Sequence, residues 1–181
     1  NIKLVCKNTG RDFNNITLVA VSKTFPEDDI SYLNDIGHLD FGENKVQELK
    51  AKYENLKHKN IKWHLIGHLQ TNKVKYVSEF VHLIHSVDSF KLAEVINDQA
   101  MKHNRIIDVL IQVNTSNEEQ KSGINPEDTK NLCEEIAKLN NIRIKGLMTI
   151  GMFTDDEDII RANFKVLKSV YDELKQIYTS F

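Results

Sequence analysis

Cysteine, proline and long apolar runs are scarce in this sequence of 181 residues, and its charges nearly balance. The two cysteines, Cys6 and Cys133, form no Cys-x-x-Cys pair, which argues against a disulfide framework and favours a reducing, cytoplasmic setting. With 24 basic and 26 acidic residues the net charge is −2, so no basic excess points to nucleic acid. No run of about 18 apolar residues and no secretory leader is visible, so we expect no membrane association.

The sequence does contain a regular alternation of short apolar runs and segments with a helical period. The apolar runs predict strands at residues 17–22, 39–41, 62–66, 83–87, 106–114 and 143–150. The periodic segments predict helices at residues 27–36, 45–56, 71–80, 90–103, 127–139 and 155–178. Because 40% of the residues are hydrophobic, the chain can bury one core, and we expect a single domain over residues 1–181.

Alternation of strands and helices is typical of a parallel sheet, which is either open and doubly wound or closed into a barrel. The pattern contains six β/α units, whereas a complete TIM-type (β/α)8 barrel has eight units and typically about 250 residues. The count alone therefore leaves two architectures, a small open α/β sheet and an incomplete barrel. In both of them, ligands bind at the carboxyl ends of the strands.

Lys23 ends the first apolar run, "LVAVSK", and shares a strand face with Val19 and Val21, which we expect to be buried. A lysine in this position can extend its amine into solvent. Alternatively, burial at the rim of an apolar strand lowers the pKa of the amine and makes it a nucleophile toward carbonyl compounds. Four glycines lie at or just beyond strand ends: Gly42, Gly67, Gly123 and Gly151. Because glycine lets a ligand approach the backbone closely, the four together favour a ligand-binding site at this edge of the sheet.

Three other features each leave two interpretations open. Asn44 in "FGEN" can cap the next helix, as residue preferences favour, or hydrogen-bond a ligand. His64 and His68 flank Gly67, but four residues of strand separate them by about 13 Å, so we expect no metal site there. The polar run "QVNTSNEEQKSG", residues 112–123, is either an active-site loop or a solvated connection.

Six segments in this order resemble the pyridoxal phosphate homeostasis protein family: "ITLVAVSKTFP", "FGENKVQELKAKY", "IKWHLIGHLQTNKVKY", "IHSVDSFKLAEVIN", "VLIQVNTSNEEQKSGI" and "IKGLMTIG". The resemblance implies a TIM-type barrel like that of alanine racemase, with pyridoxal 5'-phosphate (PLP) held as a Schiff base on Lys23. It places Asn44 beside the cofactor ring. It also places His64 and Met148 on strands that face the same pocket, with Met148 packed against the pyridine. It implies no catalytic residue and no metal ligand.

The resemblance also implies a function, because the family is regarded as holding and delivering PLP in vitamin B6 homeostasis without robust catalysis. Related racemases add a β-domain with a second base, which these 181 residues lack, and an imine without a positioned proton acceptor suits a carrier. A racemase-type or aldolase-type enzyme using Lys23 is the alternative, and an interaction module without cofactor is a third possibility. The implied partners are PLP and PLP-dependent apo-enzymes, and the implied state is a monomer or weak dimer.

The family pattern extends past Phe181, with a "SMGMS"-like segment and then a "GST…RIG" segment that cradle the phosphate. Barrel phosphate sites commonly follow strands seven and eight, which are not among the six units seen here. We therefore expect that the polypeptide is longer than this sequence or that another component completes the barrel. A chain ending here would expose strand edges and retain PLP poorly, because several charge-assisted hydrogen bonds would be lost.

Overall fold

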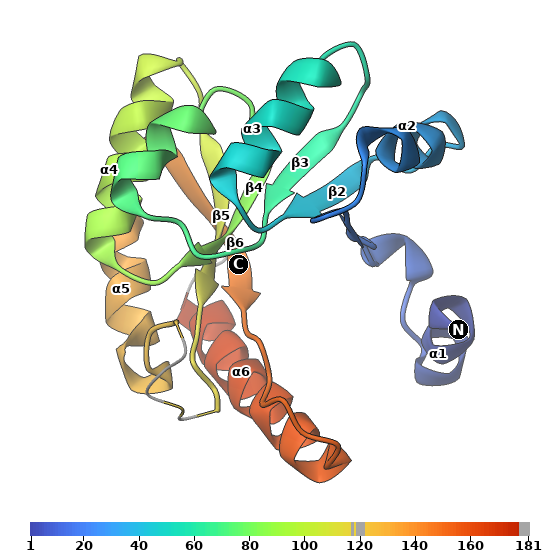
Figure 1. Cartoon of the computed structure of the whole chain (residues 1–181). Helices are drawn as coiled ribbons and strands as arrows, with labels where there is room; N and C mark the ends of the chain where they lie inside the picture. The colour runs from blue at the N-terminus through green and yellow to red at the C-terminus, as the bar shows by residue number, and fades with distance from the viewer. Residues whose placement is uncertain (117, 119–121, 178–181) are drawn as a thin grey trace.

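In the computed structural model of the chain, which describes residues 1–116, 118 and 122–177, six strands form one sheet (Figure 1). Each strand pairs in parallel with the next along the chain, so the sheet order is β1-β2-β3-β4-β5-β6. The strands are β1 Ala20–Val21, β2 Asp40–Glu43, β3 Lys62–Leu65, β4 Leu83–Val87, β5 Ile107–Gln112 and β6 Ile142–Met148. All six predicted strands are confirmed, and β1 is shorter than expected.

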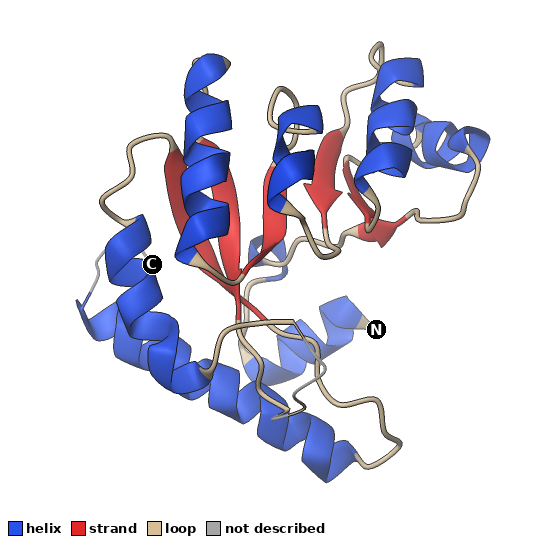
Figure 2. Ribbon diagram, turned by 60° about the vertical axis from the view of Figure 1, so that its left-hand side comes forward, coloured by secondary structure: helices blue, strands red, loops and turns tan. Residues whose placement is uncertain are grey.

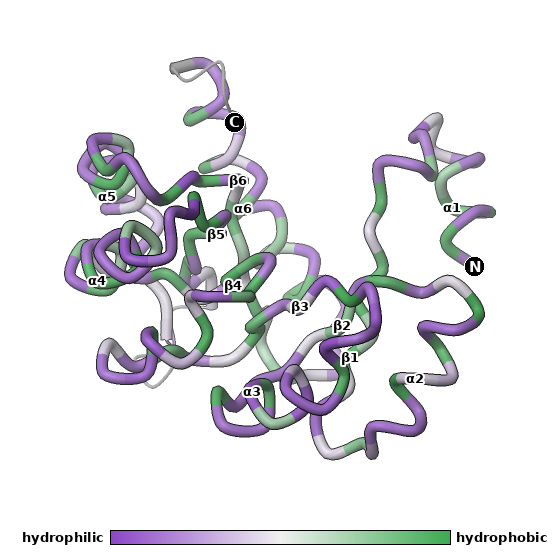
Figure 3. Tube along the Cα trace, turned by 90° about the horizontal axis from the view of Figure 1, so that it is seen from above, coloured by the Kyte–Doolittle hydropathy of each residue, from purple (hydrophilic) through white to green (hydrophobic). Residues whose placement is uncertain are grey.

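Within the described part of the chain, six α-helices and three short 3-10 segments connect or flank the strands. The α-helices are α1 Ile2–Thr9, α2 Glu27–Asp35, α3 Val46–Asn55, α4 Phe90–Lys102, α5 Thr129–Ile136 and α6 Glu157–Ile177. The 3-10 segments are η1 Phe13–Asn15, η2 Thr71–Tyr76 and η3 Pro126–Asp128. Helix α1 was not predicted from the sequence, and it lies away from the sheet (Figures 1 and 3).

The helix predicted at residues 71–80 is instead the 3-10 segment η2, so that prediction was wrong in type. Val74 and Val77 are fully buried and three residues apart. A spacing of three residues brings both side chains to one side of a 3-10 helix, which has three residues per turn. The amide of Val77 accordingly donates to the carbonyl of Val74 at 3.1 Å. The apolar spacing was therefore correct, but it suits the tighter helix.

The hydrophobic core lies between the outer face of the sheet and the helices packed on it. Phe41, Ile84 and Val109 on three different strands are fully buried. They belong to one core cluster together with Leu49 of α3 and Ile96 of α4. Figure 2 shows the helices gathered beside the strands, and Figure 3 shows the strands as a curved row with α2 to α5 along its outer side.

The arrangement decides between the two architectures that the sequence left open. A doubly wound sheet has helices on both faces and a strand order that reverses at a switch point. Here the strand order is sequential and α2 to α5 lie on one side, which is the arrangement of an incomplete (β/α) barrel. Among the described residues, no helix has both the length and the apolar character needed to cross a membrane.

Candidate functional site

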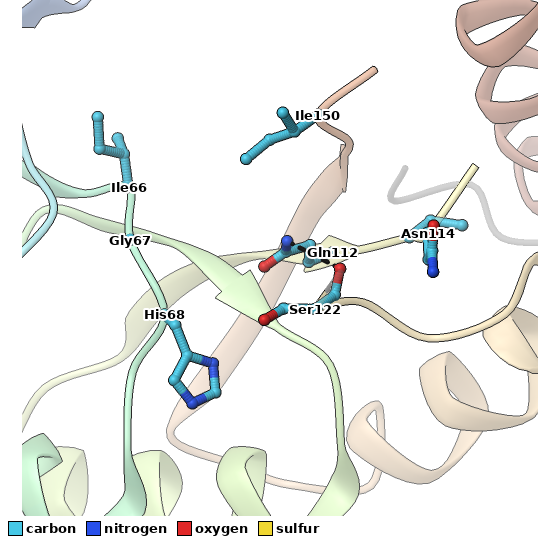
Figure 4. Close-up of a pocket in the computed structure, with 8 residues that line it drawn as sticks. Ile66, Gly67, His68, Gln112, Asn114, Ser122 and Ile150 are labelled. Carbon is cyan, nitrogen blue, oxygen red and sulfur yellow. Dashed lines mark hydrogen bonds between the residues drawn. The ribbon is translucent and has the colours of Figure 1, made fainter. Parts of the chain in front are cut away.

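The carboxyl ends of β3, β5 and β6 surround a cavity of about 200 Å³ (Figure 4). Two segments form its opposite sides, one after β3 and one at the end of β5. On the β5 side, the side-chain amide of Gln112 donates to the carbonyl of Ser122 at 3.1 Å. The lining residues are Ile66, Gly67, His68, Gln112, Val113, Asn114, Ser122 and Ile150. The structure thus places a small cavity at the edge where parallel α/β folds bind ligands.

The polar run at residues 112–123 contributes to this cavity through Gln112, Asn114 and Ser122. Residues 117 and 119–121 of the run lie outside the described part of the chain. Gly123 has φ +125°, and a Cβ there would lie 2.8 Å from the backbone nitrogen of Asn114. Only glycine lets the returning chain pack so closely against the end of β5. The geometry therefore favours a binding loop over a purely solvated connection.

Asn44, which follows β2, is held against the edge of the cavity by Gly67. A Cβ atom at position 67 would lie 2.3 Å from the backbone oxygen of Asn44, so any other residue would displace one of the two segments. Ser86 of β4 fixes Gly67 from the other side, because its hydroxyl donates to the Gly67 carbonyl at 2.7 Å. The ends of β2, β3 and β4 are therefore locked together.

Helix capping does not explain Asn44. The N-cap residue of α3 is Lys45, and no side chain accepts a hydrogen bond there. The capping interpretation, which the sequence favoured, was wrong, and the Asn44 side chain is not engaged by the first turn of the helix. Asn44 lies next to a cavity-lining residue but does not itself line the cavity.

Lys23 follows β1 and is exposed to solvent. Val19 lies two residues before Val21, so both side chains face the inner side of the sheet. A Cβ atom at Gly42 would lie 3.0 Å from the Val19 side chain, which places Val19 on the same side as Gly42. The expectation that buried valines shield the lysine was wrong, since Val21 is 47% exposed. The physical reason is that β1 is an edge strand whose inner face is uncovered in the described residues. The Lys23 amine is open to reagents and does not line the cavity.

Ser22, immediately before Lys23, has the opposite environment and is only 6% exposed. Its amide donates to the carbonyl of Gly42 at 3.0 Å, which extends the β1–β2 ladder. Its hydroxyl donates to Oε1 of Glu43 at 2.7 Å. Ser22 thus fixes the base of the lysine to β2 while the lysine side chain remains free.

His64 lies in the middle of β3, opposite Gly42 of β2, and is 3% exposed. One ring nitrogen, Nε2, lies 3.0 Å from Oδ1 of Asp40, and the other, Nδ1, lies 2.9 Å from Nε2 of His85. His64 faces the inner side of the sheet with Gly42, but it does not line the cavity at the strand ends. Lys23 and Met148 likewise do not line that cavity, so the placement of the three residues around one cofactor stays a prediction.

Burial lowers the pKa of His64, although the hydrogen bond to Asp40 partly opposes this effect. Burial, together with the nearby His64, lowers the pKa of His85 to about 4. Both rings are accordingly neutral near pH 7. The Asp40 carboxylate accepts the Nε2 proton of His64, so Nδ1 of His64 accepts from His85. The three residues form a chain with one defined direction of donation.

Asp40, His64 and His82 also offer ligand atoms that lie within 4.8 Å of one another. This grouping differs from the His64 and His68 pair considered from the sequence, because His68 lies at the cavity instead. The sequence did not reveal the grouping because its members come from three different strands or strand boundaries. Both nitrogens of His64 are already hydrogen bonded, so the described geometry is that of a polar chain.

Met148 ends β6 and is half-buried, in register with the cavity-lining Gln112 of β5. Partners in a parallel ladder point to the same face, so Met148 projects toward the inner side of the sheet. The next ladder bond runs from the amide of Val113 to the carbonyl of Met148, at 2.8 Å. Met148 thus lies close to the cavity wall without forming part of it.

Asn163 of α6 is a site-supporting residue that the sequence analysis did not identify. Its side-chain oxygen Oδ1 accepts from the backbone amide of Met152 at 2.8 Å, and its side-chain nitrogen Nδ2 donates to the backbone carbonyl of Thr115 at 3.1 Å. It therefore ties the segments that follow β5 and β6 to one helix. The available signal was its polarity, since Asn163 is buried on an otherwise apolar stripe of α6.

Comparison with known proteins extends this description. The family described as alanine racemase, N-terminal domain, matches residues 12–180. The pyridoxal phosphate homeostasis protein of Aquifex aeolicus is 43% identical over 177 residues, covering 98% of this chain and 78% of the relative. That of Pasteurella multocida is 38% identical over 178 residues, covering 97% and 76%. The chain thus spans about three quarters of each relative.

Solved structures agree with the sequence comparisons. PipY of Synechococcus elongatus, determined with PLP bound, superimposes with a TM-score of 0.85 at 30% identity, over 99% of this chain and 84% of that one. Alanine racemase of Clostridium difficile superimposes with a TM-score of 0.72 at 16% identity, over 97% and 48%. The second likeness shows the fold alone: the six strands are part of a barrel of the alanine-racemase type.

Proposed function

Because this chain belongs to the pyridoxal phosphate homeostasis protein family, within the alanine racemase N-terminal domain family, we propose that it binds PLP for vitamin B6 homeostasis. We further propose that Lys23 holds the cofactor covalently as a Schiff base. The single observation that carries this proposal is the placement of Lys23. Its amine has no hydrogen-bond partner among the described residues and lies at the carboxyl end of β1, on a backbone that is fixed to β2 through Ser22.

The residues present fit the cofactor. Lys23 would hold PLP through its amine, and the bound cofactor would supply the aldehyde with which a primary amine condenses, releasing one water. Gly67 lines the cavity without a side chain of its own, which favours the approach of a flat ring to its backbone. We propose that Asn44 orients the ring through its amide and that Met148 offers an apolar contact. His64 supports the inner wall from beneath through its bonds to Asp40 and His85.

We propose that the protein retains PLP without robust catalysis. Racemisation needs a base placed to remove a proton from the α-carbon of an amino acid. Among the described residues that line the cavity, His68 is the only titratable one. Both ring nitrogens of His64 are already hydrogen bonded, to Asp40 and His85, and the lowered pKa of each histidine makes its ring a weaker base. A racemase-type or aldolase-type activity would show as steady exchange of the α-proton that is lost in Lys23→Ala.

We also propose a cytoplasmic location, delivery of PLP to PLP-dependent apo-enzymes, and a monomer or weak dimer. The location is supported by Cys6 and Cys133, which are both buried as free thiols, as suits a reducing compartment. The single barrel domain expected over residues 1–181 remains part of the same proposal. Mixing PLP-loaded protein with a colourless apo-enzyme, and following transfer of the visible band, tests delivery directly.

The test of covalent binding uses purified protein, PLP and borohydride. We expect a visible imine band on addition of PLP, and peptide mapping after reduction should find the adduct on Lys23. Lys23→Ala should lose the band, whereas Lys45→Ala, at an exposed lysine next to Asn44, should keep it. An adduct on another lysine, or equal adducts in wild type and Lys23→Ala, would contradict the proposal.

A further inference from the structure

We infer that Lys52 of α3, acting with Glu43 and Glu48, is a positioning residue that holds the backbone on both sides of Lys23 so that its amine faces the ligand. The inference rests on the proposed function of Lys23. Lys52 itself makes no contact with the cavity, because it reaches the β1 end from the helix-covered side of the sheet.

The three hydrogen bonds of the Lys52 ammonium are all accounted for. Its Nζ atom donates to the carbonyl of Ser22, to Oε1 of Glu43 and to Oε1 of Glu48, each at 2.8 Å. An ammonium has three donors, so none remains for a ligand. The same Glu48 oxygen accepts from the backbone amide of Thr24 at 2.7 Å. The residues before and after Lys23 are therefore both tied to one buried cation.

Thr24 has a backbone conformation that needs such support. Its φ is +68°, in the left-handed region that β-branched residues rarely adopt. Strain of this kind persists only where surrounding contacts enforce it. The hydrogen bond from the Thr24 amide to Glu48 holds this conformation from one side. A second hydrogen bond, from the amide of Phe25 to the carbonyl of Ser22 at 3.1 Å, closes the turn. Without these contacts the turn relaxes and Lys23 points elsewhere.

Burial makes the network sensitive to the loss of its cation. The side chains of Lys52 and Glu43 are 7% and 0% exposed. Burial opposes the charged form of Lys52, but its hydrogen bonds to Glu43 and Glu48 outweigh that effect, so its pKa is raised above the usual value for a lysine. Oε2 of Glu43 has no hydrogen-bond partner among the described residues. The Glu43 carboxylate thus depends on Lys52 and Ser22, both bound through Oε1.

The structure therefore gives two nearby lysines opposite states. Lys23 is exposed and unbound, which suits a nucleophile once deprotonated. Lys52 is buried and held as a cation by two carboxylates, which suits a fixed charge. The second lysine prepares the first by fixing its backbone, since it has no free donor with which to take part in the chemistry.

The experiment compares Lys52→Met with Arg105→Met as a matched control. Arg105 is also a partly buried cation that binds backbone carbonyls, those of Ser78 and Val81, both at 2.7 Å. We expect Lys52→Met to weaken PLP binding at Lys23 by about tenfold or more, because a charge-assisted hydrogen bond is lost. Hydrogen exchange at the Thr24 amide, followed by NMR without PLP, should accelerate by at least about tenfold. Arg105→Met should change neither quantity, although it lowers the melting temperature.

Two readouts separate this inference from the proposed function. If wild type forms no adduct on Lys23, the proposed function fails, and exchange at Thr24 still decides whether Lys52 holds the turn. If Lys52→Met binds PLP and exchanges at Thr24 as wild type does, the inference is overturned. Should Lys52→Met not fold, Glu48→Met serves instead, because it removes the acceptor of the Thr24 amide and keeps the Lys52 and Glu43 pair. Faster exchange and weaker binding in Glu48→Met support the inference, and wild-type exchange at Thr24 overturns it.

Discussion

The buried pair of His64 and His85 makes a quantitative prediction about stability in acid. In the native protein, burial and the neighbouring His64 hold the pKa of His85 at about 4, whereas the unfolded chain titrates at 6.5. Between these values the unfolded state binds more protons than the native state, so unfolding becomes more favourable as the pH falls. The difference between the two pKa values of His85 corresponds to about 3 kcal/mol of unfolding free energy. This contribution is fully present above pH 6.5 and is lost by about pH 4.

The assay is thermal unfolding in buffers from pH 7 to pH 4 at constant ionic strength. For a chain of this length, about 3 kcal/mol corresponds to a fall of roughly 6 to 12 °C in melting temperature. His85→Asn removes the titrating ring while its amide can still donate to His64, so this variant should show a flatter profile. His103→Gln, at an exposed histidine that ends α4, provides the control and should retain the wild-type slope.

The comparison of slopes is what tests the reasoning, because carboxylates also titrate over this range. A His85→Asn profile that falls as steeply as wild type would refute the assignment of a neutral, buried imidazole pair. His64 has its pKa lowered in the same direction, so some slope should remain in the variant.

Two further predictions follow from the geometry of single residues. Gly67→Ala should lower the free energy of unfolding by about 1–3 kcal/mol and weaken PLP binding, because the added Cβ would lie 2.3 Å from the backbone oxygen of Asn44. Urea unfolding measures the stability and PLP titration measures the binding. Unchanged values would show that the two segments can move apart freely. Burial, and to a smaller extent the charge of the nearby Glu134, raises the pKa of Cys133 to about 12. Its thiol should therefore resist iodoacetamide until urea unfolds the chain. Rapid alkylation of Cys133 in the native protein, detected by peptide mass, would contradict its burial.

The strands and the main helices could be predicted from the sequence because their apolar spacing follows directly from packing against one layer. The side of the sheet that the helices cover could not, since periodicity identifies a buried face without saying what covers the other one. The sequential order and one-sided helices needed the structure. The error at residues 71–80 has the same origin, because Val74 and Val77 satisfy the spacing of more than one type of helix.

The candidate site was predicted in part. The strand-end position of Lys23 was readable from the sequence, but its exposure was not, because that depends on what covers the edge strand β1. Glu48 and Lys52 read as an ordinary surface pair four residues apart on a helix. Their connection to Ser22 and Thr24 arises only when α3 packs behind β1 and β2. His64 and His85 are likewise brought into hydrogen-bond contact only by the pairing of neighbouring strands.

The sequential pairing of the six strands also bears on how the chain is made. Every strand finds its first partner among residues that leave the ribosome just before it, so each closed loop is one β/α unit long and its entropic cost is small. Assembly can therefore advance vectorially during translation, with each unit docking on the one before it, while β1 and the newest strand form the two edges of the growing sheet.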